Sequence, residues 1–463
     1  MYKFAAKTYT LLLMKKIALM ILALLTTVGT FATNATIELN DNERAFVAQN
    51  SDFAFRLFRE ARNAQSSMLN AQSSMVLSPL SITYALGMLN NGATGETQQQ
   101  INQVLGSVAG DASERCSRIN SFCRKMLDET GTLDKETKVL IGNTVFVNEG
   151  QGIRLQDAFV EKAVSYYDAE PQSRDFADGL TRDVINQWGS DHTNGMIKEV
   201  LSEDDFNKEM ASYLLNALYF KGTWTNKFKV EDTKKEPFNV SGEVDMMHQN
   251  EEFGYKENDL YQAVHLPYGN ECFAMTVFLP REGKTIGDLL EKLTANDWYK
   301  YFESYMVDLA LPRFSTDTDQ SLKMIMQQLG MPTPFDPKNA EFPYFCNGPT
   351  FIAMMKQVTK IEVNEEGTEA AAITTIGNAA TSIPQMATFH ADRPFFYIIS
   401  ERSTNTIFFM GQYTGSTTTG IGAPQAITVQ KQSATDIYSL TGQRLQAPPT
   451  RGMYIQGKRI MRR

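Results

Sequence analysis

The 463-residue chain contains only four histidines, and no catalytic motif surrounds any of them. It has no HExxH segment for zinc, no G-x-S-x-G turn around a nucleophilic serine and no GxxxxGK[ST] phosphate loop. A site assembled from distant residues stays open. His265, however, lies in the apolar run 263–266, where a packed or hydrogen-bonded histidine is the more usual role. The sequence therefore predicts no catalytic residues, no metal site and no cofactor, which argues against an enzyme.

Cysteine is also scarce, and the spacing of the four cysteines argues against the common cysteine-based sites. Cys116 and Cys123 belong to a helical segment and are separated by about 10 Å along its axis, too far for a disulfide. There is no CxxC pair and no cysteine–histidine cluster that would suit zinc. We therefore expect buried free thiols at residues 116, 123, 272 and 346.

Positive charge is outnumbered by negative charge along the chain. The sequence has 44 Lys and Arg against 53 Asp and Glu, a formal net charge of −9, and no dense basic stripe before the last few residues. Because nothing would compensate the phosphate charge, nucleic acid is not expected as a partner. The length and the 42% hydrophobic content suffice for one large core or two ordinary ones, and we expect a monomer.

No apolar run is long enough to span a membrane comfortably, and the one near the N-terminus is typical of an export signal. Met14-Lys15-Lys16 forms a short basic region, residues 17–28 are apolar, and Thr30-Phe31-Ala32 offers a small-residue cleavage context. The signal region is thus predicted over 1–32, with Met14 as the expected true start. The alternative is a membrane anchor. There is no cysteine near the cleavage region, so a lipid-anchored form is not expected.

The expected elements mix helices and strands without regular alternation. An amphipathic helix is predicted over 43–62, and Ser78-Pro79 caps a second helix that ends near Asn90-Asn91-Gly92. Further helices are predicted near 155–167 and 180–193. Strands are predicted over 75–77, 139–141, 145–147, 213–221, 261–267, 273–280, 306–313, 351–363, 394–400 and 406–413. Because the strands and helices do not alternate as regular βαβ units, we expect an α+β fold with large sheets and not a doubly wound nucleotide-binding fold.

The segment 368–382 lacks the residues that surface loops usually contain. It has no proline, no basic residue and few turn formers before Gly377-Asn378. Long loops without turn chemistry are uncommon and usually functional. One face of a strand here would carry small or β-branched side chains that fit between two existing strands, at Thr368, Ala370, Ala372, Thr374 and Ile376. The segment is interpreted as a strand that waits to be buried, and the alternative is a flexible Ala/Thr-rich linker.

Several motifs in the chain resemble, in order and spacing, those of the serpin family. The stretch 363–372 (VNEEGTEAAA) is similar to the hinge of inhibitory serpins, and the similarity covers roughly residues 43–413. The other matching segments are 78–82 (SPLSI), 88–89, 92–93, 193–197 (TNGMI), 216–224 (NALYFKGTW), 311–314 (LPRF), 329–331 (LGM) and 409–411 (FMG). The resemblance implies a serpin domain over 40–415, with a large central mixed sheet, further sheets, about eight to nine helices and an exposed reactive loop.

The resemblance also assigns site residues. The hinge would comprise Glu365, Gly367, Thr368, Glu369, Ala370, Ala371 and Ala372. The region that opens the central sheet would contain Ser78, Ser81, Asn216, Trp224 and Gln357. Many serpins carry a histidine where this chain has Gln357. Because glutamine still donates and accepts hydrogen bonds, we expect altered sheet-opening energetics rather than loss of the mechanism.

Family spacing, counted from Glu365, places the reactive bond between Thr381 and Ser382, with Ala380 as the alternative donor of the attacked carbonyl. The stretch 381–384 is similar to the one that follows the specificity residue of antitrypsin. The small residues at this bond favour elastase-like or subtilisin-like serine peptidases. The implied function is a secreted suicide substrate that traps the acyl-enzyme. The alternatives are a non-inhibitory serpin with a binding or chaperone-like role, and a surface enzyme or adhesin, which would need a catalytic constellation or repeats.

The C-terminal end differs in composition from the rest. Residues 416–433 begin with a Thr/Gly-rich run and are predicted to be a linker. Residues 434–463 suggest two or three short strands with a basic end, and they resemble the sorting module of the type IX secretion route of Gram-negative bacteria. That resemblance implies a bacterial protein that crosses the periplasm, engages the secretion machinery and ends on the cell surface or outside. The alternative is an ordinary small β appendage.

Overall fold

The computed structural model describes residues 35–69, 73–239, 242–368 and 385–415, together with the short tail strands 437–439, 444–445, 453–456 and 459–462. The chain divides into two units, residues 1–417 and 418–463. The predicted signal region 1–32 and the linker 416–433 lie outside the described residues and stay predictions. Among the helices that the structure describes, none is long and apolar enough to cross a membrane.

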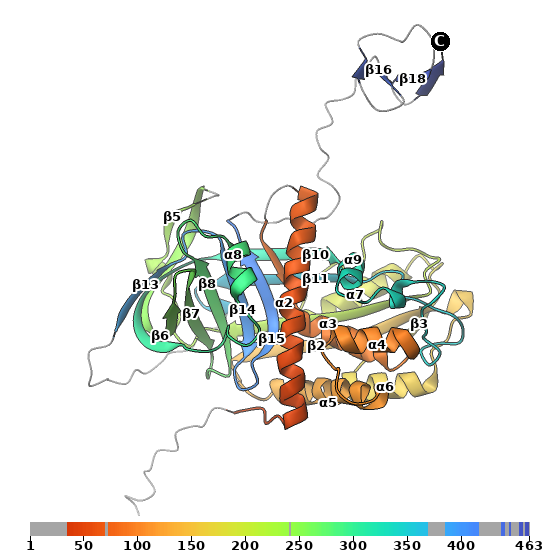
Figure 1. The fold of residues 1–463 in the computed structure, drawn as a ribbon, viewed down its shortest axis with the longest axis horizontal. Helices are drawn as coiled ribbons and strands as arrows, with labels where there is room; N and C mark the ends of the chain where they lie inside the picture. Colours follow the sequence, from red (N-terminus) through yellow and green to blue (C-terminus); the bar gives the residue numbers. More distant parts are fainter. Residues whose placement is uncertain are drawn as a thin grey trace, which may run out of the picture. The chain divides into compact units, whose positions relative to one another are not determined.

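The first unit contains eight α-helices within its described residues, in line with the expected number (Figure 1). The predicted apolar face of the first one is confirmed, because Phe46, Phe53, Leu57 and Phe58 are all buried. Phe58 packs on Phe396 with ring centroids 5.2 Å apart. The helices are α2 (Asp41–Leu69), α3 (Pro79–Asn90), α4 (Gly95–Val104), α5 (Ala112–Thr130), α6 (Asp157–Tyr167), α7 (Thr181–His192), α8 (Ile286–Lys292) and α9 (Lys323–Gln328).

A nine-stranded sheet forms one side of the first unit, in the order β1-β15-β14-β8-β7-β6-β9-β13, with β5 paired to β6. Most neighbours are antiparallel, and β13 runs parallel to β9. Its strands are β1 (Met75–Leu77), β5 (Lys234–Phe238), β6 (Gly242–Glu257), β7 (Tyr261–Tyr268), β8 (Phe273–Pro280), β9 (Glu303–Pro312), β13 (Met386–His390), β14 (Phe395–Glu401) and β15 (Thr406–Tyr413). Every residue of β8, β14 and β15 is buried, as a central strand covered on both faces requires.

A six-stranded mixed sheet carries the hinge. Its order is β10-β11-β12-β4-β2-β3, antiparallel except for the pair β2 and β3. Its strands are β2 (Thr137–Asn148), β3 (Gln172–Arg174), β4 (Ser212–Thr223), β10 (Phe314–Ser321), β11 (Lys356–Asn364) and β12 (Gly367–Thr368). The strand predicted over 351–363 was wrong at its start, because residues 351–355 are irregular and β11 begins at Lys356. The two predicted pieces 139–141 and 145–147 belong to the single strand β2.

Helix α3 supports this sheet from the core side. The Ser78 hydroxyl accepts from the Ser81 N–H, and Pro79 occupies the first turn, so the predicted cap is confirmed. All twelve residues of α3 are buried, and the helix packs against β2 and β4 and also against α4, α5 and α6 (Figure 1). The N-terminus of α3 therefore brings the polar groups of Ser78 and Ser81 into the interior, where they need partners from the sheet.

The thiols and the surface charge agree with the composition. Cys116, Cys123, Cys272 and Cys346 are free and buried, as expected. Burial raises the pKa of the Cys116 thiol to about 11, so it is a poor nucleophile at neutral pH.

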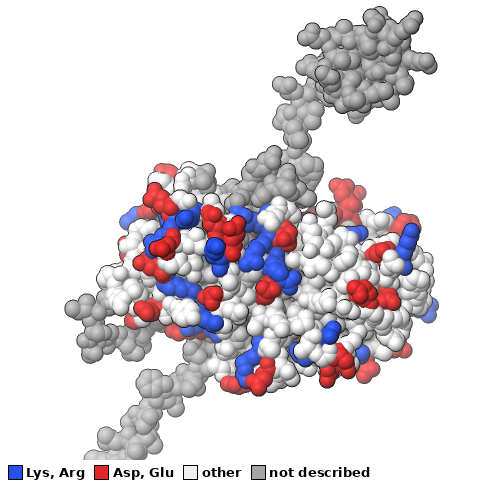
Figure 2. Space-filling view, viewed as in Figure 1, with Lys and Arg blue, Asp and Glu red and all other residues white. Residues whose placement is uncertain are grey.

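Figure 2 shows both signs of charge interspersed with uncharged residues over the visible face of the first unit, with a short band of Lys and Arg near its middle.

The second unit contains a four-stranded antiparallel sheet in the order β17-β16-β18-β19. Two or three strands were expected here, and the structure has four. They are β16 (Ile437–Ser439), β17 (Arg444–Leu445), β18 (Met453–Gln456) and β19 (Arg459–Arg462). A small β module of this kind fits both the sorting-module interpretation and a plain appendage, so the role of 434–463 stays a prediction.

Candidate functional site

The predicted hinge begins in a tight hairpin at one end of the six-stranded sheet. Strand β11 turns at Glu365-Glu366 into β12, where Val363 pairs with Thr368 and Asn364 with Gly367. The other edge of β12 pairs with β4, through Gly367 opposite Thr223 and Thr368 opposite Gly222. The first two residues of an additional strand therefore already lie between β11 and β4.

The side chain of Glu365 is held by polar groups from two other segments of the chain. Its carboxylate, only 5% exposed, pairs with the Arg313 guanidinium and accepts from the Thr233 hydroxyl at 2.7 Å. Burial acts to raise its pKa, but the hydrogen bonds from Arg313 and Thr233 outweigh burial and leave the pKa of Glu365 below its usual value. The carboxylate is thus charged and fixed at neutral pH, and it anchors the start of the hinge.

Trp224, which follows β4, fastens the hairpin from the other side. Its indole N–H donates to the Asn364 carbonyl at 2.9 Å, and its backbone N–H donates to the Glu366 carbonyl at 2.9 Å. The ring stacks on Tyr268, with centroids 4.4 Å apart and planes within 9°. Trp224 therefore belongs with the hinge.

Gly367 and Thr368 are closely surrounded by the Gly222 backbone and the Tyr268 side chain. Gly367 has φ +147°, and a Cβ there would come within 2.1 Å of the Gly222 carbonyl oxygen. Thr368 is fully buried, and its hydroxyl is 2.7 Å from the Tyr268 hydroxyl. The second residue of β12 is therefore a buried position where the threonine hydroxyl has a partner on β7.

The four other residues predicted for sheet opening lie together at the N-terminus of α3. Gln357 of β11 hydrogen-bonds both backbone groups of Ser78, and the Ser81 hydroxyl donates to the Asn216 side chain on β4. The Asn216 amide continues to Asn143 of β2 at 2.6 Å. Asn216 and Trp224 are eight residues apart along the chain, or ~26 Å. Trp224 was predicted to belong to the same region as these four residues, but in the structure it lies at the hinge.

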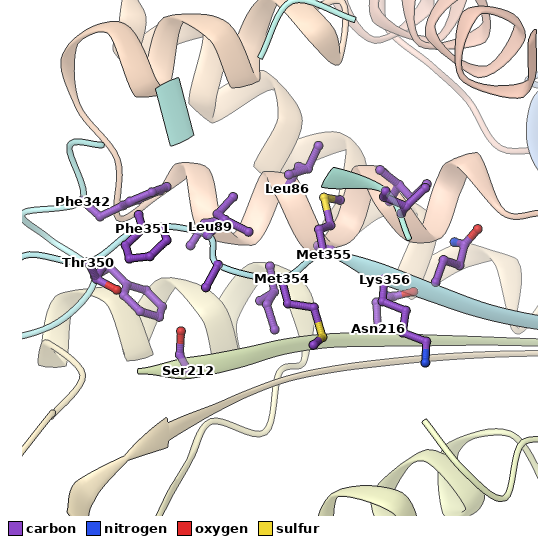
Figure 3. A pocket seen from close by; sticks show the side chains of 18 of the residues that line it. Leu86, Leu89, Ser212, Asn216, Phe342, Thr350, Phe351, Met354, Met355 and Lys356 are labelled. Atoms are coloured by element: carbon purple, nitrogen blue, oxygen red, sulfur yellow. The ribbon is translucent and has the colours of Figure 1, made fainter. Parts of the chain in front are cut away.

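An apolar cavity lies beside this polar group, between α3, β4 and the irregular segment before β11 (Figure 3). Ser81, Asn216 and Gln357 border it on one side. Its apolar lining includes Leu86, Leu89, Leu214, Phe342, Phe351 and Met355. Within the part of the chain that the structure describes, β4 and β11 have no pairing of their own, and β12 alone joins them.

Part of the predicted site falls on residues that the structure does not describe. Glu369, Ala370, Ala371 and Ala372 of the hinge, and Ala380, Thr381 and Ser382 at the reactive bond, lie outside the described residues. The sequence reasoning missed Arg313, Thr233 and Tyr268, which contact the hinge from distant segments. Arg313 stands in the quoted motif 311–314, but only the fold shows that it faces Glu365.

The histidines take structural positions. His265 shares a hydrogen bond of 3.0 Å with the Thr276 hydroxyl on the neighbouring strand, and burial, assisted by Arg402 and Lys256, lowers its pKa to about 3. His248 contacts Glu236, and His390 contacts Asp308. Among the described residues no group of three or more His, Cys, Asp or Glu side chains is arranged to hold a metal ion.

Comparison with known proteins decides the family. A family model described as serpin (serine protease inhibitor) matches residues 48–415. The chain belongs to the serpin family. The description of this family names an inhibitor and not an enzyme, in line with the expectation that the chain is not an enzyme. The predicted α+β serpin fold is confirmed as well.

Relatives span most of this serpin and most of their own length. Mouse antithrombin-III is 31% identical over 379 residues, covering 78% of this chain and 80% of the relative. Human neuroserpin is 30% identical over 358 residues, covering 73% and 85%. Among solved structures, the thermophilic serpin tengpin in the native state superposes with a TM-score of 0.71 at 25% identity, covering 82% of this chain and 96% of that one.

Proposed function

We propose that this serpin inhibits serine peptidases by inserting its cleaved reactive loop as a new strand between β11 and β4. The pairing of β12 carries the proposal. Thr368 is already hydrogen-bonded between the two strands, and below it they have no mutual pairing in the described part of the chain. The residues that follow Thr368 could therefore continue β12 between β4 and β11.

The observed register predicts where each inserted residue would lie. Continuing it antiparallel places Ala372 between Thr359 and Leu218, Thr374 between Gln357 and Asn216, and Ile376 between Met355 and Leu214. Because Thr368 faces the core, the even-numbered residues would face the core too. Thr374 would then meet the polar group at α3, and Ile376 would enter the apolar cavity of Figure 3.

Insertion would provide both the driving force and the trap, as loop insertion does in serpins generally. About fourteen inserted residues at ~3.3 Å each would carry an acylated peptidase on the order of 45 Å. Each new ladder hydrogen bond contributes ~1 kcal/mol net, so the sum is large. If displacement distorts the peptidase, loss of one oxyanion-hole donor slows deacylation by ~10²–10³.

The target class is proposed from the reactive-bond sequence. Thr381-Ser382, or Ala380-Thr381 one residue earlier, offers small side chains to the specificity pocket, similar to antitrypsin after its specificity residue. Elastase-like or subtilisin-like peptidases accept such residues. No Lys or Arg occurs between Lys360 and Arg393, which disfavours trypsin-like targets.

The location of the protein outside the cytoplasm is also a proposal. The export signal over 1–32 and the sorting-like tail over 434–463 support a bacterial protein that passes through the periplasm to the cell surface or the medium. Fractionation of a type IX-competent host expressing the full chain would test this: surface or medium location is expected, and retention in the cytoplasm would contradict it.

The inhibitor proposal is tested by incubating the full chain with pancreatic elastase, subtilisin and trypsin, followed by denaturing electrophoresis. We expect a denaturation-resistant complex with elastase or subtilisin, and N-terminal sequencing of the released fragment should place the cut within 379–382. Cleaved chain without complex from every peptidase would favour the non-inhibitory alternative.

A matched pair of variants makes that test sharper. Ala372→Arg would put a charge on the core-facing side of the inserted strand, between Thr359 and Leu218, and should abolish complex formation while leaving cleavage intact. Glu369→Arg introduces the same side chain on the opposite, outward face and should retain the complex. Equal loss in both variants would argue against insertion in this register.

A further inference from the structure

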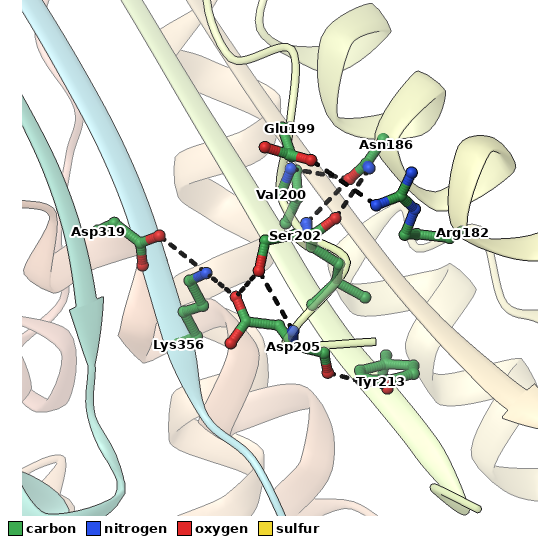
Figure 4. A network of polar contacts seen from close by, with 10 residues as sticks. Arg182, Asn186, Glu199, Val200, Ser202, Asp205, Tyr213, Asp319 and Lys356 are labelled. Carbon is green, nitrogen blue, oxygen red and sulfur yellow. Dashed lines mark hydrogen bonds and ion pairs between the residues drawn. The ribbon is translucent and has the colours of Figure 1, made fainter. Parts of the chain in front are cut away.

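A polar network crosses the outer face of the six-stranded sheet, on the side away from α3 (Figure 4). Its centre is Lys356, the first residue of β11. The Lys356 ammonium lies 2.5 Å from an Asp205 carboxylate oxygen and 2.8 Å from an Asp319 carboxylate oxygen. The lysine side chain is only 14% exposed, so both ion pairs are partly shielded from solvent.

Asp205 belongs to the β4 side of the sheet. It lies in the connection from α7 to β4, and the Ser202 hydroxyl donates to its carboxylate at 2.8 Å. Asn186 of α7 fixes the same connection, because its side-chain oxygen accepts from the N–H groups of Val200 and Leu201 at 2.9 and 2.8 Å. Asp205 is therefore presented on a connection that is tied to α7 and continues into β4.

Asp319 belongs to the β11 side. It lies on β10, which pairs with β11 through Asp319 opposite Val358 and Ser321 opposite Lys356. The Lys356–Asp319 pair thus stays within one half of the sheet. Only the Lys356–Asp205 pair spans the place where β4 and β11 lack a pairing of their own in the described residues.

The register shows why this pair matters. A new strand continued from Thr368 would put Thr375 opposite Lys356 on β11 and opposite Leu215 on β4. Odd-numbered residues would face outward, so the Thr375 side chain would enter the space that the ion pair spans. A strand between two neighbours also requires two spacings of ~4.8 Å at this level. An inserted strand and the Lys356–Asp205 ion pair would therefore compete for the same space at this level.

We propose that the Lys356–Asp205 ion pair is an outer clasp that must open before the loop inserts past this level, so that it sets the rate of insertion. The inference rests on the proposed inhibitory function and names the residues that regulate it. Asp319 lowers the cost of opening, because it keeps a carboxylate on the partly buried ammonium after Asp205 leaves.

The test measures uptake of a synthetic peptide with the sequence of residues 368–380 by the intact full chain, followed by native electrophoresis. Asp205→Asn should speed uptake about five- to tenfold, because the clasp is lost and the amide still accepts from Ser202. Asp319→Asn is the matched control: it removes the other ion pair of the same lysine and should leave uptake unchanged or slower. Asp205→Glu should restore a rate close to that of the parent chain.

A second variant and a second readout separate a clasp from a folding defect. Lys356→Met keeps the side-chain length, loses both ion pairs and should accelerate uptake as Asp205→Asn does. Each variant is first shown by circular dichroism to be folded. Parent-like uptake by both Asp205→Asn and Lys356→Met, or equal acceleration by Asp319→Asn, would overturn the clasp.

Failure of the clasp and failure of the inhibitory function give different results. If the parent chain takes up the peptide and forms peptidase complexes but Asp205→Asn changes nothing, only the clasp is wrong. If the parent chain neither takes up the peptide nor forms complexes, the proposed function itself fails. If the clasp holds, Asp205→Asn also raises the fraction of encounters that end in complex rather than cleaved chain.

Discussion

Gln357 satisfies both backbone polar groups of Ser78: its amide nitrogen donates to the Ser78 carbonyl at 2.9 Å, and its amide oxygen accepts from the Ser78 N–H at 3.0 Å. Both residues are buried. The glutamine thus links β11 to the N-cap of α3. The pair explains how this serpin accommodates glutamine at a position where many serpins carry histidine.

Replacing Gln357 by alanine should destabilise the native state by about 1–3 kcal/mol, because two buried backbone groups lose their partners. Chemical denaturation of the full chain measures the change. Val358→Ala, at the adjacent half-buried position that faces the outer side, is the control and should cost less. A Gln357→Ala variant as stable as the parent would show that water replaces the glutamine.

Gly367→Ala should displace β12 from between β11 and β4. The new Cβ would lie 2.1 Å from the Gly222 carbonyl oxygen, a backbone atom that cannot turn aside. Gly283→Ala is a matched control, because Gly283 also has a positive φ, +76°, but has open space around its Cβ position. We expect Gly367→Ala to lower the unfolding temperature more than Gly283→Ala and to increase proteolysis next to the hairpin. Equal effects would mean that backbone strain alone matters.

The sequence predicted the fold class, the serpin family and the segment of the hinge, because these depend on local patterns. Alternation marks the long strands, and Ser78-Pro79 marks the start of α3. The residue types of the hinge also have local causes: the Gly222 backbone leaves no room for a Cβ at Gly367, and the Thr368 hydroxyl has Tyr268 as its partner.

What the sequence could not predict depends on contacts between distant segments. Lys356 and Asp205 are 151 positions apart, and Arg313 and Glu365 are 52 apart, so no short pattern joins them. The false strand start at 351 has a similar cause. Phe351 and Met355 are apolar enough for a strand, but they line the cavity beside α3 instead of pairing with β4. The apolar character of a segment indicates that it is buried, but it does not indicate which element the segment packs against.

Stability should fall on mild acidification because of His265. Its pKa is lowered to about 3 in the folded protein by burial, against about 6.5 in an unfolded chain. Between these values the unfolded chain binds more protons, so the stabilisation present above pH 6.5 is lost as the pH falls toward 3. The loss between pH 7 and pH 5 is about 2 kcal/mol.

The variant that isolates this effect is His265→Gln, which keeps a hydrogen-bonding group near Thr276. Its unfolding free energy should depend less on pH between 7 and 5 than that of the parent chain. His390→Gln removes a different histidine, half-exposed beside Asp308, and serves as the control. If His265→Gln keeps the full pH dependence, another group is responsible.

Removing one hydroxyl of the Thr368–Tyr268 hydrogen bond should destabilise the protein more than the hydrogen bond itself contributes, because the other hydroxyl stays buried without a partner. Both hydroxyls are buried and lie 2.7 Å apart. Thr368→Val or Tyr268→Phe alone leaves an unsatisfied hydroxyl, at a cost of about 1–3 kcal/mol, whereas the double variant removes both groups and should cost clearly less than the sum. A double-mutant cycle by chemical denaturation measures the coupling. Additive losses would mean that each hydroxyl has another partner and that Thr368 is held in place by packing alone.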